Sequence, residues 1–173
     1  MEQSQRRCRI LVAGLGNVLL MDDGVGVHAI EQLRKDPPPH ACLAGVGTAV
    51  LYALDLIEWA DKIIAIDAVK AGGPPGTLYA FDGDGAAERD HPVSLHELNL
   101  LGALRLLGPD HPRPEIVIVG VEPETIDYGL ELSPAVQAAL PQVALAVREI
   151  VDVWDQNPDA LNIEELRGAM AWR

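Results

Sequence analysis

The chain is poor in aromatic and basic residues, and it has no long apolar run. Only 4% of its 173 residues are aromatic, and 13 Lys and Arg stand against 26 Asp and Glu, giving a net charge of −13. Such an acidic surface repels nucleic-acid phosphates and anionic lipids, and so few aromatic rings disfavour a base-stacking platform. No stretch approaches the roughly 20 apolar residues that span a bilayer. The composition therefore predicts a protein that binds neither nucleic acid nor membranes.

Cysteine is also scarce, because Cys8 and Cys42 are the only two in the chain. Two cysteines cannot build a disulfide framework or a four-thiolate zinc site, and neither lies in a context that suggests an activated nucleophile. The sequence contains no GxSxG elbow and no HExxH motif. These absences exclude the common covalent and zincin hydrolase designs.

The amino-terminal segment resembles an export signal only superficially. Arg6 and Arg7 precede an apolar run at 10–21, but Asn17 interrupts the run, acidic residues follow it, and no small-residue cleavage site is visible. With its few cysteines, the chain is therefore predicted to be cytoplasmic, in a reducing compartment.

Apolar residues make up 49% of the chain, which is enough for one sizeable core. Its length has room for a single domain and little more. We predict one domain over residues 1–154, followed by a peripheral polar tail at 155–173.

Apolar, strand-like runs alternate with segments of helical periodicity. Five runs are predicted as strands: 9–14, 41–46, 62–67, 77–81 and 115–120. Four segments are predicted as helices: 24–35, 48–59, 94–107 and 133–154. The alternation, with no internal repeat, predicts an α/β fold: a three-layer α/β/α sandwich around a mostly parallel, twisted sheet of about five strands.

Two helix starts carry specific signals. Thr48 is predicted to cap the second helix, whose apolar face would include Leu51 and Ile57. Ser133 followed by Pro134 is typical of a helix N-terminus. Pro141 lies within the last helix, so a kink rather than a break is expected there.

The glycine-rich segment 14–26 joins a predicted strand to a predicted helix, where phosphate-binding loops lie. A GxGxxG fingerprint would need glycine at position 19, which is Leu19. Asp22 and Asp23 at the helix start would also repel a phosphate. The segment is therefore not predicted to bind a nucleotide.

Three side chains are candidates for a site. Asp22 or Asp23 follows the first strand, Asp67 ends the strand at 62–67, and His96 lies in the first turn of the third helix. Ligand sites in open α/β sheets gather at the carboxyl ends of strands, so these groups are expected on one edge. Two carboxylates and an imidazole suit a divalent transition metal. Each residue also has an ordinary structural alternative, since acidic helix caps and buried histidines are common.

Four ordered blocks resemble one family. The runs are GLGNVLLMDDGVGVHAI, IIAIDA with PPGT, SLHELNLLGAL, and IVGVEPET with GLELSPAV, and together they extend from about Arg9 to Trp154. They resemble the nickel–iron hydrogenase maturation endopeptidases. One departure is visible at 45–48, where Gly45 stands in place of an aspartate found in many relatives.

The resemblance implies an aspartic-type endopeptidase that removes a C-terminal extension from the nickel-loaded precursor of the hydrogenase large subunit. It implies that Asp23, Asp67 and His96 are the catalytic residues and metal ligands. The metal would be nickel carried by the precursor, although zinc or cadmium could occupy the same ligands. A monomer is expected.

The resemblance leaves the chemical role of the metal open. Nickel could report a loaded precursor, polarise the scissile carbonyl or activate water, and a carboxylate acting as general base is the competing idea. A non-proteolytic maturation factor that binds the precursor or its nickel is the alternative function.

Overall fold

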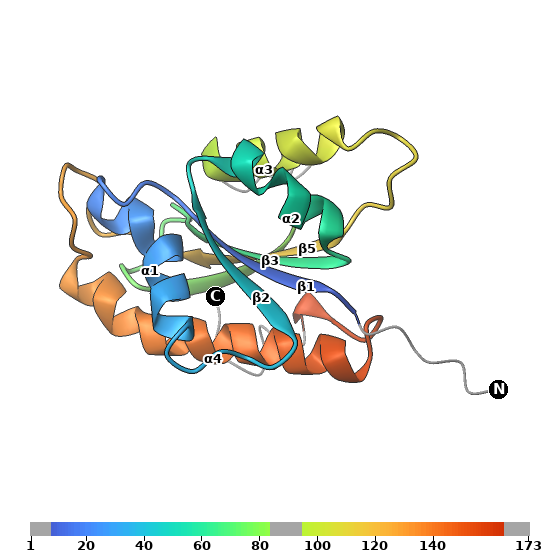
Figure 1. Cartoon of the computed structure of the whole chain (residues 1–173). Coiled ribbons are helices and arrows are strands. Elements are labelled where there is room, and N and C mark those ends of the chain that lie inside the picture. Colours follow the sequence, from blue (N-terminus) through green and yellow to red (C-terminus); the bar gives the residue numbers. More distant parts are fainter. Residues whose placement is uncertain (1–7, 84–94, 165–173) are drawn as a thin grey trace.

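The computed structural model describes residues 8–83 and 95–164, and it confirms the predicted sandwich. Helices α1 and α4 cover one face of the sheet and helices α2 and α3 cover the other (Figure 1). The helices of the described residues are α1 (Val25–Leu33), α2 (Leu54–Trp59), α3 (Leu95–Leu106) and α4 (Pro134–Gln156). Two short 3-10 helices, η1 (Met21–Gly24) and η2 (Val50–Ala53), precede α1 and α2.

The sheet has five strands within the described residues, in the order β2-β1-β3-β5-β4. They are β1 (Ile10–Leu15), β2 (Ala41–Gly47), β3 (Lys62–Ala68), β4 (Leu78–Asp82) and β5 (Glu115–Val121). All neighbours pair in parallel except β4, which runs antiparallel to β5 at one edge. Every residue of β1 and β3 is buried, as expected for central strands with helices on both faces.

Helix α4 supplies the longest apolar stripe. Six residues at helical spacing, all at most 5% exposed, pack into the core: Val136, Leu140, Val143, Val147, Ile150 and Trp154. The Ser133 side chain accepts a hydrogen bond from the Val136 N–H, which confirms the predicted cap. The helix continues through Pro141 without a break.

The start of the second helical segment differs from the prediction. Thr48 does not cap a helix; η2 follows Ala49, which makes no side-chain cap bond. Leu51 is 64% exposed although Ile57 is buried. The tight 3-10 turn rotates Leu51 out of the stripe that a continuous α-helix would have formed.

The described part of the tail is attached to the domain. Leu161 and Ile163 pack against the core of α1 and α4, and the Lys62 ammonium donates to the Pro158 carbonyl at 2.7 Å. These contacts attach residues 158–163 to the domain.

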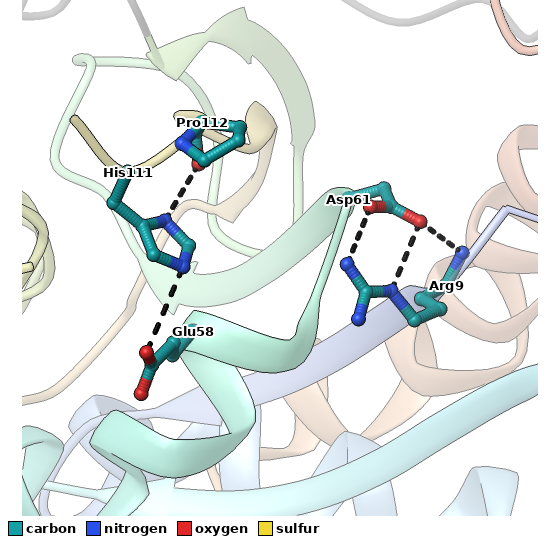
Figure 2. A network of polar contacts seen from close by, with 5 residues as sticks. All are labelled: Arg9, Glu58, Asp61, His111 and Pro112. Atoms are coloured by element: carbon teal, nitrogen blue, oxygen red, sulfur yellow. Dashed lines mark hydrogen bonds and ion pairs between the residues drawn. The ribbon is translucent and has the colours of Figure 1, made fainter.

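Polar contacts secure the amino-terminal edge of the sheet (Figure 2). The Arg9 backbone N–H and guanidinium both bond the Asp61 carboxylate, at 2.8–3.2 Å. His111 lies near Glu58 at 3.8 Å and contacts the Pro112 carbonyl at 2.8 Å. None of the described helices is long and apolar enough to cross a membrane.

Candidate functional site

The three candidate residues lie around the carboxyl-terminal edge of the sheet. Because β1 and β3 are parallel neighbours in which Gly14 pairs with Ile66, Asp67 and the segment after β1 reach the same edge. Asp23 belongs to η1, directly after that segment. His96 lies in the first turn of α3.

Asp23 and His96 are in direct contact. The His96 Nε2 lies 3.0 Å from the Asp23 Oδ2, and the two side chains are only 11% and 15% exposed. The same carboxylate oxygen accepts the Asn17 N–H at 2.9 Å. An ionised carboxylate only accepts hydrogen bonds, so Nε2 carries the proton in this contact.

The contact shifts both pKa values in the direction of an ion pair. The hydrogen bond to Asp23 raises the pKa of His96 above its usual range, against the effect of burial, and the charge of Asp67 adds to the rise. Burial alone would raise the pKa of Asp23, but the bonds from His96 and Asn17 and the charge of Lys70 outweigh it. The pKa of Asp23 is therefore lowered, and its carboxylate is ionised at neutral pH.

Asp67 is buried at the end of β3, with 1% of its surface exposed. Its Oδ1 accepts the Ala68 N–H at 2.9 Å. Its charge acts on His96, which places it in the electrostatic neighbourhood of the Asp23–His96 pair.

The donor set has the chemistry of a divalent-metal site but not a closed geometry. Two carboxylates and an imidazole are suitable ligands for nickel or zinc. Within residues 8–83 and 95–164, however, no three His, Cys, Asp or Glu side chains are arranged to hold an ion by themselves. To use Nε2 as a ligand, His96 must release the proton that it shares with Asp23. The buried Nδ1 of His96 has no hydrogen-bond partner among these residues.

Asp22 has a different role from its neighbour, and it is not a helix cap. No side chain caps η1 or α1. The fully buried Asp22 carboxylate instead accepts three backbone N–H groups, from Glu124 and Thr125 at 2.9 Å and from Ser133 at 2.7 Å. Asp22 therefore fastens the segment between β5 and α4 to the loop that carries Asp23.

Glu122 is a third buried carboxylate at this edge, after Asp22 and Asp67, and the sequence reasoning missed it. It accepts N–H groups from residues 71–73 and the hydroxyl of Tyr79 at 2.8 Å. The residue thereby shapes the turn after β3, next to Lys70. The only signal in the sequence was its place in the block IVGVEPET, directly after a strand.

The glycines of segment 14–26 allow close packing of backbone. A Cβ on Gly26 would lie 2.1 Å from the Ile66 carbonyl oxygen, so α1 can approach β3 only with glycine there. Gly16 has a φ of +106°, and a Cβ on it would lie 1.7 Å from the Asp23 carbonyl oxygen. These glycines bring η1 against the sheet and hold Asp23 at the edge.

Of the other histidines in the described ranges, His111 is far from the candidate site. It precedes the first residue of β5 and lies near Glu58, in the polar network at the amino-terminal edge of the sheet (Figure 2). His91 lies outside the described residues.

Comparison with known proteins supports the pattern of motifs. The HycI family, described as hydrogenase maturation protease, matches residues 27–150. The Hydrogenase 2 maturation protease of Escherichia coli is 37% identical over 152 residues, which cover 82% of this chain and 92% of that protein. The hydrogenase expression/formation protein HoxM of Cupriavidus necator is 31% identical over 156 residues, 86% of this chain and 77% of that one.

Solved structures agree in fold. The [NiFe] hydrogenase maturation protease HybD from Thermococcus kodakarensis superposes with a TM-score of 0.72 at 28% identity, covering 82% of this chain and 98% of that one. The hydrogenase maturating endopeptidase HybD from E. coli has a TM-score of 0.66 at 33% identity, with 82% and 93% covered.

Proposed function

Because the chain belongs to the HycI family of hydrogenase maturation proteases, we propose that it is an endopeptidase acting on the nickel-loaded precursor of a NiFe hydrogenase large subunit. It removes the C-terminal extension of that precursor. The cytoplasmic location and the monomeric state stay predictions.

The observation that carries this proposal is the buried Asp23–His96 contact at the carboxyl-terminal edge, with Asp67 close enough to act on His96. Segments 73 residues apart supply the two partners, so the contact is a product of the fold. The three residues are those that the family resemblance assigned to the metal.

Nickel enters this reaction as part of the substrate. The three side chains form an incomplete ligand set, which is suited to contacting an ion whose other ligands the precursor supplies. To bind the ion through Nε2, His96 would be a neutral imidazole with its proton on Nδ1, and the proton lost from Nε2 would pass to solvent. Asp23 would exchange one hydrogen bond for the metal contact. The precursor is thereby accepted only when it carries its ion.

The assignment of catalytic roles to the carboxylates is a further part of the proposal. A carboxylate with a lowered pKa is a weak base, so Asp23 is better suited to metal contact than to proton abstraction. Asp67 is then the carboxylate available to orient or deprotonate the attacking water. This division accounts for an aspartic-type activity without a covalent intermediate.

The test is incubation of the purified chain with nickel-loaded and nickel-free precursor, followed by intact-mass spectrometry. We expect a shortened large subunit only with nickel. Asp67→Asn keeps the size of the side chain but removes its basicity, and it should abolish cleavage. Nickel-dependent binding of the precursor should weaken but persist, because Asp23 and His96 still contact the ion. Binding without cleavage by the wild type would instead support a non-proteolytic maturation factor.

A further inference from the structure

A pocket lies between η2 and α3, and its lining residue Asn99 is one helical turn along α3 from His96. Its volume is about 400 Å³. Eight residues line it: Thr48, Ala49, Val50, Leu51, Tyr52, Asn99, Gly102 and Ala103. At its rim Leu51 is 64% exposed and Tyr52 is 95% exposed, so this turn presents large apolar groups to solvent.

The pocket continues the candidate site along one helix face. His96, Asn99 and Ala103 are spaced by three and four residues, which places them on the same side of α3. With a rise of about 1.5 Å per residue, Ala103 lies about 10 Å along the axis from His96. An extended peptide covers that distance in about three residues.

The lining has a distinct chemistry. Among the side chains that the structure describes, none of those lining the pocket is charged, although the chain carries a net charge of −13. Apolar groups dominate, and Thr48 and Asn99 supply a hydroxyl and an amide that can bond a peptide backbone. The volume lies within the range of about 300–1,000 Å³ that is usual for ligand pockets, so it can admit a side chain of the substrate. These properties favour an uncharged peptide segment over an acidic or basic one.

We propose that this pocket is a substrate subsite that binds an uncharged, apolar side chain of the precursor about two to three residues from the scissile bond. The proposal rests on the proposed function and adds to it a specificity determinant. Leu51 and Tyr52 close over the bound segment from one side, and α3 forms the other wall.

Gly102 permits a sharp test. A Cβ added at this position meets nothing within 4 Å, so the backbone leaves open space where a larger side chain begins. Because Gly102 lines the pocket, we expect that side chain to fill part of it. Leucine is also a better helix former than glycine. Gly102→Leu should therefore leave the melting temperature unchanged or raise it, while KM for cleavage of the nickel-loaded precursor rises at least tenfold and kcat changes less than threefold.

Leu51 offers a matched pair of variants. Leu106 is also on the surface and also 64% exposed, but it does not line the pocket. Leu51→Asp should raise KM at least tenfold, whereas Leu106→Asp should leave both kinetic constants within twofold of the wild type.

The substrate side completes the experiment. A set of precursors is made in which each carries one aspartate, at one of the five positions on either side of the scissile bond. Aspartate at one position, two to three residues from the bond, should strongly slow cleavage by the wild type. In Gly102→Leu that position should lose most of its effect, because the filled pocket no longer admits the side chain.

The outcomes separate the two proposals. If the wild type cuts no precursor, the proposed function fails. If it cuts and Gly102→Leu cuts with the wild-type KM, the subsite is refuted and the protease function stands. If Gly102→Leu instead converts a dimer to a monomer in sedimentation, the pocket is covered by a second copy of the chain and the subsite is also refuted.

Discussion

Replacement of Asp22 by alanine should destabilise the protein far more than replacement of any exposed acid. The Asp22 carboxylate is fully buried and accepts three backbone N–H groups. Hydrogen bonds to a charged group contribute about 1.5–3 kcal/mol each, and each buried donor left unpaired costs about 1–3 kcal/mol. These contributions are not additive, because water can reach the half-buried donors at Glu124 and Thr125.

We therefore expect Asp22→Ala to lower the free energy of unfolding by about 3–5 kcal/mol. For a chain of this size that corresponds to a fall in melting temperature of about 10 °C. Asp22→Asn retains one acceptor oxygen but turns an NH₂ group toward backbone donors, so it should cost about 2 kcal/mol.

Urea unfolding followed by circular dichroism measures these differences. Asp127→Ala is the matched control, because this exposed acid of the same loop bonds only the Tyr128 N–H in the described residues. It should change stability by less than about 0.5 kcal/mol. If the free energies of unfolding of Asp22→Ala and Asp127→Ala differed by less than about 1 kcal/mol, Asp22 would not stabilise this loop as we infer.

Four further predictions concern other groups. His96→Ala should lower the free energy of unfolding by about 2 kcal/mol, because it removes a hydrogen bond to the Asp23 carboxylate, and it should reduce cleavage at least a hundredfold in the precursor assay. Because the pKa of His96 is raised, its pair with Asp23 stabilises the fold fully below about pH 6.5, and this stabilisation is lost as the pH rises through the pKa of His96 in the folded protein. Because the pKa of Asp23 is lowered, the stabilisation from its carboxylate is lost only below about pH 4. The stability gap between wild type and His96→Ala, measured by urea unfolding, should therefore be wider at pH 6 than at pH 9, and an equal gap would contradict the ion pair. Glu122→Gln should cost about 2–3 kcal/mol in the same assay, because its amide NH₂ would face backbone donors. Burial and the nearby Asp61 charge raise the pKa of Cys8, so iodoacetamide should alkylate this thiol at pH 8 more slowly than free cysteine, and Asp61→Asn should speed the reaction.

The periodicity of the sequence was sufficient for the framework. The strand at 62–67 and the helix behind Ser133 were predicted within about two residues of their observed bounds, because a buried parallel strand and a long amphipathic helix each leave a strong local pattern. The η2 turn was missed, since a 3-10 segment of four residues has too little repeat to distinguish it from the α-helix that follows.

The candidate site was only partly readable in the sequence. The rule that ligand sites gather at the carboxyl ends of parallel strands placed Asp67 and the Asp22-Asp23 pair on one edge. This rule could not predict the contact between His96 and Asp23, because the contact depends on how α3 packs, and the two residues are 73 positions apart in the chain.

Tertiary structure alone determines the different contacts of Asp22 and Asp23. The two acids are adjacent and chemically alike, so composition, spacing and propensity treat them equally. The segment between β5 and α4, more than 100 residues later, folds over Asp22 and buries it under three N–H donors. Asp23 is left facing His96 at the edge of the sheet. Sequence determined that a carboxylate would stand here, and long-range packing determined which of the two supports the loop after β5 and which contacts His96.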